Sequence, residues 1–129
     1  MKNIIIVTGG AGFVGSNLIA LLLKRTKFKI ISIDNYSTGK IKNHINDSRV
    51  KYIRGNTKNV KKILKKEINK IKTIFHFGEF SRIYQSFLNM NDCIDSNNIG
   101  SHEVFNFCLL NKIKLVYSAT SASIGNRGN

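Results

Sequence analysis

The first 34 residues constrain the fold more strongly than any other part of this chain. The apolar run Ile4–Val7 leads directly into the glycine-rich segment Thr8–Gly15, and an apolar helical pattern follows over Asn17–Leu23. A second apolar run, Lys29–Ile33, then ends on Asp34. The order strand, tight turn, helix, strand and acid is typical of a βαβ unit that binds a dinucleotide.

Three glycines of the turn have separate physical reasons to be there. Gly10 allows the sharp turn out of the strand, and the absence of a Cβ at Gly12 lets backbone N–H groups approach a pyrophosphate. Gly15 allows the helix to pack closely on the strand, and the helix N-terminus offers unpaired N–H donors with a partial positive charge. A P-loop is excluded, because Ser16 follows Gly15 and no Lys-Ser or Lys-Thr pair closes the loop.

The acid at the end of the second run predicts which dinucleotide binds. Asp34 lies 19 residues beyond Gly15, close to the spacing of about 20 expected for an acid that binds the adenosine ribose. A carboxylate at this position accepts hydrogen bonds from the ribose hydroxyls and repels a 2′-phosphate. The sequence therefore predicts NAD rather than NADP, and a glycine-rich turn without any ligand is the alternative interpretation.

The glycines also fit the register Thr8-Gly9-x-x-Gly12-x-x-Gly15, and further motifs follow at Asp34–Gly39, Gly55-Asn56, Phe75-His76, Asn97–Ser101 and Lys114–Thr120. In these motifs the chain resembles the extended short-chain dehydrogenase/reductase family, in particular the NAD-dependent epimerases and dehydratases that act on nucleotide sugars. The resemblance covers essentially the whole chain. It implies NAD as the cofactor and a nucleotide sugar as the substrate of the complete enzyme, with hydride transfer between a sugar carbon and tightly bound NAD.

The resemblance also implies a set of site residues. The implied cofactor-binding residues are Gly9, Gly10, Gly12, Phe13, Val14, Gly15, Asp34, Asn35, Ser37, Thr38, Gly39, Asn56, Phe77, Gly78, Asn97 and Ser118. The catalytic hydroxyl of the family falls on Thr120, five positions before Gly125. A strand-end hydroxyl that satisfies backbone groups is the alternative role for Thr120.

The family's catalytic Tyr-x-x-x-Lys motif is expected a few dozen residues beyond Thr120, but the sequence ends at Asn129 and Tyr117 is its last tyrosine. We therefore expect residues 1–129 to form an incomplete NAD-binding Rossmann domain that lacks the C-terminal substrate domain and is inactive alone. The alternative is a non-catalytic dinucleotide-binding module or an inactive truncated product. A homodimer, or a complementing C-terminal segment, is the expected protein partner.

Two residues are predicted to lie on the substrate side. Glu79 stands where the family has alanine after His76, so its carboxylate is expected near the nicotinamide ribose or the substrate, and a surface ion pair with Arg82 is the alternative. Ser86 is placed near the sugar by its position alone. His76 is expected to be half-buried with satisfied hydrogen bonds rather than catalytic.

Hydrophobic periodicity predicts alternating strands and helices. The predicted strands are 3–8, 29–34, 50–54, 73–77 and 114–119, and the predicted helices are 12–25, 58–70, 82–90 and 96–111. This pattern predicts an α/β fold with a Rossmann-like, doubly wound parallel sheet of strand order 3-2-1-4-5, truncated after strand 5. The ligand crevice is expected between strands 1 and 4.

The strong positive charge has a structural interpretation. The chain carries 21 Lys and Arg against 7 Asp and Glu, a net charge of +14. Seven lysines between residues 58 and 72 alternate with apolar residues at helical spacing, which predicts the solvated face of an amphipathic helix. No RNA-binding signature accompanies them, so no specific nucleic-acid partner is predicted.

Two cysteines, Cys93 and Cys108, lack the spacing of a metal site, and no metal is predicted. They are expected to be reduced thiols in a cytoplasmic protein. No apolar stretch approaches the roughly 20 residues of a membrane span.

Overall fold

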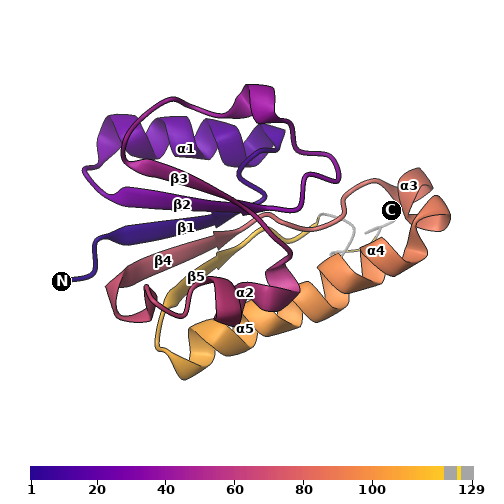
Figure 1. The fold of residues 1–129 in the computed structure, drawn as a ribbon. Helices are drawn as coiled ribbons and strands as arrows, with labels where there is room; N and C mark the ends of the chain where they lie inside the picture. The colour runs from indigo at the N-terminus through magenta and orange to yellow at the C-terminus, as the bar shows by residue number, and fades with distance from the viewer. Residues whose placement is uncertain (121–124, 126–129) are drawn as a thin grey trace.

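A computed structural model describes residues 1–120 and residue 125 (Figure 1). Five parallel strands form one sheet in the order β3-β2-β1-β4-β5, which confirms the predicted strand order. The strands are β1 (Ile4–Thr8), β2 (Lys29–Asp34), β3 (Val50–Arg54), β4 (Ile71–His76) and β5 (Lys114–Tyr117). Because the order reverses between β1 and β4, a crevice is expected at their carboxyl ends.

Helices cover both faces of the sheet, as parallel strands require. Helix α1 (Phe13–Arg25) lies on one face, and α2 (Val60–Ile63) and α5 (Ser101–Leu110) lie on the other (Figure 1). Two short helices, α3 (Ile83–Leu88) and α4 (Met90–Ile94), lie beyond the carboxyl ends of the strands. The fold therefore leaves the carboxyl end of the sheet framed by loops and by these two helices.

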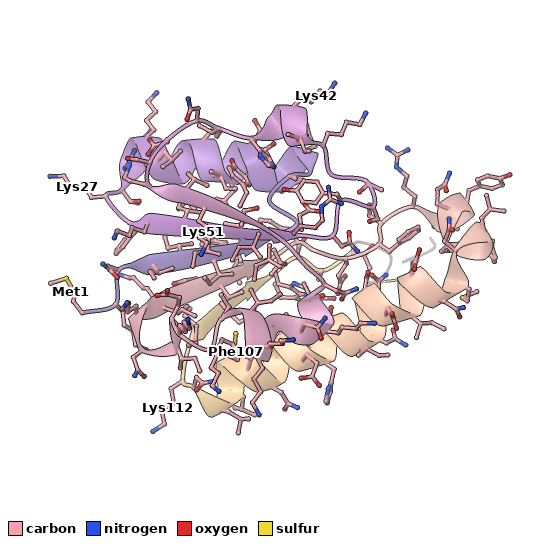
Figure 2. All side chains as sticks on the ribbon, in the orientation of Figure 1. Met1, Lys27, Lys42, Lys51, Phe107 and Lys112 are labelled. Carbon is pink, nitrogen blue, oxygen red and sulfur yellow. The ribbon has the colours of Figure 1, made fainter. Side chains whose placement is uncertain are left out.

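The alternation of side chains along β1 builds two apolar cores. Ile5 and Val7 pack with Ile19 of α1 on one face. Ile4 and Ile6 belong to the larger core on the opposite face, which α2 and α5 cover. Side chains of successive strand residues point to opposite faces, so a strand that is buried on both sides reads as a continuous apolar run. Long lysine side chains such as Lys27, Lys42 and Lys112 project away from these cores (Figure 2).

The prediction of one continuous helix over 58–70 is wrong. A 3₁₀ turn at Thr57–Asn59 leads into the four-residue helix α2, and a second 3₁₀ turn at Ile68–Lys70 precedes β4. Val60 and Leu64 are fully buried, and all seven lysines of the segment are exposed. The apolar spacing thus identifies the buried face correctly, but separate short turns satisfy the same spacing as one helix does.

The predicted helix over 96–111 joins a longer helical stretch. After α4, a π-helical segment at Asp95–Gly100 leads without interruption into α5. The π-helical segment packs closely against the turn after β3. A Cβ at Gly100 would therefore overlap the hydroxyl of Thr57. A side chain there would push the helix off this turn. The helix predicted over 82–90 is shorter than expected, since it is present as α3 over Ile83–Leu88.

Three strands also differ from the prediction in their boundaries. β1 begins one residue later than predicted, and β4 begins at Ile71 and ends at His76. β5 ends at Tyr117, so Ser118 and Thr120 follow the strand rather than belonging to it. Both residues are exposed.

In residues 1–120 and 125, no helix is long and apolar enough to span a bilayer.

Candidate functional site

The glycine loop brings three segments into close contact. Gly9 has φ +71°, and a Cβ there would lie 2.8 Å from the backbone carbonyl of Phe77 after β4. A Cβ on Gly15 would overlap the carbonyl oxygen of Gly9, and a Cβ on Gly10 would overlap the hydroxyl of Ser32. Only residues without side chains fit these positions. The loop therefore joins β1 to α1 at a close approach and holds the end of β4 beside it.

The N-terminus of α1 opens toward this crevice without a side-chain cap. Its N-cap residue, Gly12, makes no side-chain hydrogen bond to the helix, and the first turn contains no acidic residue. The first amides of a helix have no partner within the helix and carry a partial positive charge. This end of the thirteen-residue helix is therefore suited to an anionic group.

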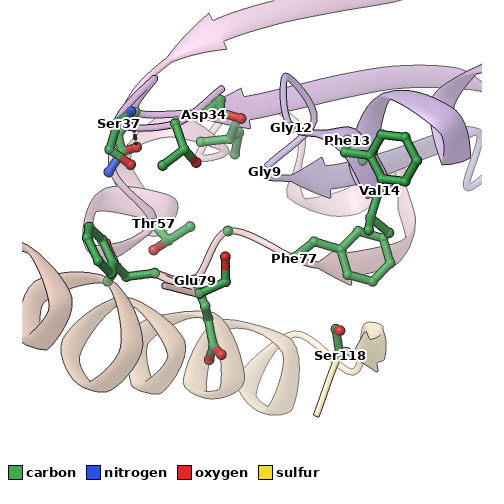
Figure 3. A pocket seen from close by; sticks show the side chains of 18 of the residues that line it. Gly9, Gly12, Phe13, Val14, Asp34, Ser37, Thr57, Phe77, Glu79 and Ser118 are labelled. Atoms are coloured by element: carbon green, nitrogen blue, oxygen red, sulfur yellow. Dashed lines mark hydrogen bonds between the residues drawn. The ribbon is translucent and has the colours of Figure 1, made fainter. Parts of the chain in front are cut away.

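Asp34 links the glycine loop to the loop after β2. Its Oδ2 accepts a hydrogen bond from the Ala11 amide at 2.9 Å, and its Oδ1 accepts one from the Tyr36 amide at 2.8 Å. Gly39 packs on the same carboxylate, since a Cβ there would lie 2.8 Å from Oδ2. A carboxylate offers about four acceptor sites, so Asp34 keeps acceptor capacity after these two bonds. Its side chain faces the crevice (Figure 3).

These elements line a cavity of about 280 Å³ at the carboxyl ends of the strands. The predicted residues that line it are Gly9, Gly12, Phe13, Val14, Gly15, Asp34, Asn35, Ser37, Thr38, Phe77, Gly78, Glu79 and Ser118. The cavity is also lined by residues that were not predicted as site residues: Ile33, Gly55, Thr57, Phe80, Ser81 and Ser96. Most of these residues are next to a predicted site residue in the sequence. Their position beside a motif could have predicted them, whereas their residue type alone could not.

Four predicted cofactor residues do not line the cavity and have structural contacts instead. The amide side chain of Asn97 accepts a hydrogen bond from the Phe80 N–H at 2.6 Å and donates one to the Phe80 carbonyl at 2.9 Å. Asn56 accepts a hydrogen bond from the Lys58 amide at 3.0 Å. Gly10 and Gly39 provide the close packing described above. Asn97 therefore fixes the backbone of one cavity wall, and its direct contact with a cofactor stays a prediction.

His76 is fully buried rather than half-buried, and its hydrogen bonds define its tautomer. The Thr8 hydroxyl oxygen accepts from the Phe77 and Gly78 amides at 3.1 and 2.9 Å, so its own O–H points to Nδ1 of His76 at 2.6 Å. Nε2–H of the same ring donates to the Ser101 hydroxyl at 2.7 Å. Burial lowers the pKa of His76, and the nearby Glu79 carboxylate opposes this shift. The ring is therefore neutral. Its two hydrogen bonds, to Thr8 and Ser101, confirm the expectation that both ring nitrogens have partners.

Glu79 continues the same network. Its Oε1 accepts hydrogen bonds from the hydroxyls of Ser101 at 2.5 Å and Tyr117 at 2.8 Å. The bond to Glu79 is the main reason that the pKa of Tyr117 is raised. The side chain runs away from Asp34 toward the helix that carries Ser101 (Figure 3). Within the described part of the chain Glu79 forms no ion pair with Arg82, so that alternative is not supported.

Two further predicted residues are Ser86 and Thr120. The Ser86 hydroxyl donates to the Ile83 carbonyl within α3 at 2.6 Å, and Ser86 does not line the cavity. Thr120 is exposed just beyond Ser118. Their substrate-side and catalytic roles stay predictions. Over residues 1–120 and 125, no cluster of His, Cys, Asp and Glu could hold a metal ion.

Comparison with known proteins identifies the family. The profile of the NAD dependent epimerase/dehydratase family matches residues 5–129. The chain belongs to this family. The family is NAD-dependent, which confirms the predicted cofactor at the level of the family. The Rossmann-like sheet and the nucleotide-sugar-type resemblance agree with this membership.

Several solved epimerase structures superpose on this member of the NAD dependent epimerase/dehydratase family. A UDP-N-acetylglucosamine 4-epimerase from Methanobrevibacter ruminantium, in complex with UDP-N-acetylmuramic acid, matches 100% of the chain at 29% identity and TM-score 0.82. The epimerase Mth375 from Methanothermobacter thermautotrophicus matches 94% of it at 26% identity and TM-score 0.82. The UDP-glucose 4-epimerase of Thermus thermophilus, in complex with NAD, matches 91% at 25% identity and TM-score 0.77.

The chain is shorter than these proteins. It covers 42% of the Methanobrevibacter enzyme, 36% of Mth375 and 37% of the Thermus enzyme. The matched part is the one that contains the glycine loop, Asp34 and the cavity.

Proposed function

We propose that residues 1–129 form the NAD-binding part of a nucleotide-sugar epimerase or dehydratase. The observation that carries this proposal is the cavity that the glycine loop, the uncapped N-terminus of α1 and Asp34 share. Family membership and the NAD complex of the similar Thermus epimerase support it. The donor set fits a dinucleotide, since unpaired amides suit a pyrophosphate and a carboxylate suits ribose hydroxyls.

Each part of the cavity has a proposed place along the cofactor. The amides at the start of α1, from Phe13 onward, hold the pyrophosphate, and the free acceptor sites of Asp34 hold the adenosine ribose. Thr57 and its neighbours after β3 enclose the adenine. Phe77 and Ser118, at the ends of β4 and β5, border the nicotinamide half. These assignments follow the chain order of a Rossmann site, in which the first βα turn meets the pyrophosphate.

When bound, NAD supplies a hydride acceptor and donor for a sugar carbon. The proposed role of Thr120 in the complete protein is to orient the reacting hydroxyl by a hydrogen bond, while Glu79 lies on the substrate side. A nucleotide sugar is the proposed substrate class, since the similar Methanobrevibacter and Thermus enzymes are UDP-sugar 4-epimerases. A second copy of the chain or a complementing C-terminal segment is the proposed protein partner, and the cytoplasm is the proposed location.

Titration of the 129-residue chain with NADH and NADPH tests the proposal, with Asp34→Asn as the variant. The substitution removes the charge and one oxygen acceptor but keeps the size of the side chain. We expect NADH to bind more tightly than NADPH to the unsubstituted chain. For Asp34→Asn the dissociation constant of NADH should rise about tenfold, because hydrogen bonds to a charged group are lost, and the preference over NADPH should shrink.

Glu67→Gln is the matched control, since it also removes one carboxylate charge. Glu67 lies just before β4, at the amino end of the sheet, where it pairs with Lys70 at 3.4 Å. The NADH affinity of the Glu67→Gln variant should equal that of the unsubstituted chain. A folded chain that binds neither nucleotide, or an Asp34→Asn variant that binds NADH unchanged, would contradict the proposed site.

A further inference from the structure

A second cavity, of about 400 Å³, adjoins the first on the side of α3 and α4. Ser37, Thr38 and Phe80 line both cavities, so the two adjoin along a shared wall. The backbone of Phe80 is held on both its N–H and its carbonyl by Asn97, at 2.6 and 2.9 Å. The wall between the cavities is therefore fixed in place before any ligand arrives.

Four polar residues form the far wall of the second cavity: Arg82, Gln85, Asn89 and Asp92. Arg82 is the N-cap of α3, and Asn89, with φ −130° and ψ 53°, joins the end of α3 to the start of α4. The wall is therefore built from two short helices and their ends. These four polar residues thus line the second cavity together. Ser37 and Thr38 also line it and add two hydroxyl groups.

The described residues of the two cavities differ in that only the second cavity includes a side-chain cation. Among the described residues that line the first cavity, both charged side chains are carboxylates, Asp34 and Glu79. A pyrophosphate held at the start of α1 therefore meets amides there but no side-chain cation. Arg82 supplies a cation in the adjoining cavity, and in the described part of the chain it forms no ion pair. A guanidinium binds phosphate oxygens in a bidentate geometry that amides cannot reproduce.

We propose that Arg82 binds a phosphate group of a nucleotide that lies across the two cavities, with the hydroxyls of Ser37 and Thr38 as further donors. The inference rests on the proposed nucleotide-binding function of the first cavity. Asp92 also lines the second cavity, but a carboxylate repels phosphate, so the phosphate is assigned to Arg82 rather than to the surroundings of Asp92. The phosphate belongs either to the dinucleotide or to the nucleotide part of a nucleotide sugar.

Calorimetric titration of the 129-residue chain with NADH, and separately with UDP, tests this assignment in Arg82→Gln and Arg25→Gln. Arg25 is an exposed arginine in the last turn of α1, at the amino end of the sheet, and serves as the matched control. We expect Arg82→Gln to weaken binding of one of the two nucleotides about tenfold, because a charge-assisted hydrogen bond to phosphate is lost. Arg25→Gln should change neither affinity by more than about twofold, since distant exposed charges are screened.

The nucleotide affected identifies the source of the phosphate. Weaker NADH binding assigns Arg82 to the cofactor, and weaker UDP binding with unchanged NADH binding assigns it to the second nucleotide. If the chain binds UDP in an Arg82-dependent way but does not bind NADH, the proposed NAD site fails and the Arg82 site stands. Equal affinities in Arg82→Gln and the unsubstituted chain, or no binding of either nucleotide, would overturn the assignment.

Discussion

Replacement of Gly15 by alanine is expected to destabilise the chain and to abolish NADH binding together. A Cβ at this position would overlap the carbonyl oxygen of Gly9 and would lie 2.7 Å from the Cα of Gly10. All the overlapped atoms belong to the backbone, so no side chain can move aside to relieve the contact. Because overpacking of this kind costs about 1–3 kcal/mol, the free energy of unfolding should fall by at least that amount. Urea denaturation of both chains measures the loss.

Gly12→Ala is the matched comparison, because it adds the same methyl group in the same loop without the severe contact. Its Cβ would lie 3.3 Å from the Gly9 carbonyl oxygen, and among the described residues beyond its own chain neighbours it would make no other contact within 4 Å. We expect its free energy of unfolding to stay within about 0.5 kcal/mol of the original value. Its NADH affinity should still fall, since the methyl group enters the cavity beside the start of α1. Equal stability of the Gly15→Ala and Gly12→Ala variants would contradict the packing role of Gly15.

The sequence predicts best those features that depend on neighbours in the chain. The bounds of β2 and β3 agree with the prediction at both ends, and Asp34 lies at the end of β2 as predicted. Local sequence carries this signal, since turn-forming residues follow both strands, Asn35 after β2 and Gly55 after β3. The strand order follows from alternating strands and helices together with the right-handed rule for crossovers.

Features that depend on distant contacts are not accessible from the sequence. Glu79 meets Tyr117, which lies 38 residues further along the chain, and nothing near either residue in the sequence indicates the pairing. The burial of His76 depends likewise on Thr8 and Ser101, which β1 and α5 bring to its two ring nitrogens. The break after α2 escapes prediction because Leu64 completes the buried face at a turn as well as it would within a helix. Periodicity reports which side chains are buried, and the backbone path between them is decided by the packing of the whole layer.

Replacement of His76 by phenylalanine is expected to cost more stability than removal of any exposed histidine. The ring fills a fully buried space, so phenylalanine conserves the volume but offers no nitrogen to the hydroxyls of Thr8 and Ser101. The Thr8 O–H would lose its acceptor and the Ser101 oxygen would lose the donor from Nε2–H, while their other hydrogen bonds remain. A buried donor or acceptor left unpaired costs about 1–3 kcal/mol, so we expect a total loss of about 2–4 kcal/mol in the free energy of unfolding. His102→Phe is the control, because His102 is exposed on α5. Urea denaturation at about pH 7.5 compares the two variants, and similar losses in both would contradict the structural role of the network.

The same ring predicts how stability depends on pH. Burial lowers the pKa of His76 in the folded chain, whereas the unfolded chain titrates near the ordinary value of about 6.5. Below this pH the unfolded state binds the extra proton and the folded state does not, so acidification favours unfolding. The contribution of His76 is therefore fully present above about pH 6.5, and it is lost at up to about 1.4 kcal/mol per pH unit as the pH falls toward the folded pKa.

Denaturation at about pH 7.5, 6.5 and 5.5 should show this slope in the unsubstituted chain and in a His102→Gln control, which keeps His76. A His76→Gln variant should lose most of the slope, because glutamine does not titrate. If that variant does not fold, the imidazole signals of His76 in the unsubstituted chain give the same information by NMR, since its ring should remain neutral below the ordinary imidazole pKa of about 6.5. Protonation of His76 at about pH 6.5 would show that burial does not hold the ring neutral, and the assignment of Nε2–H as the donor to Ser101 would then lose its support.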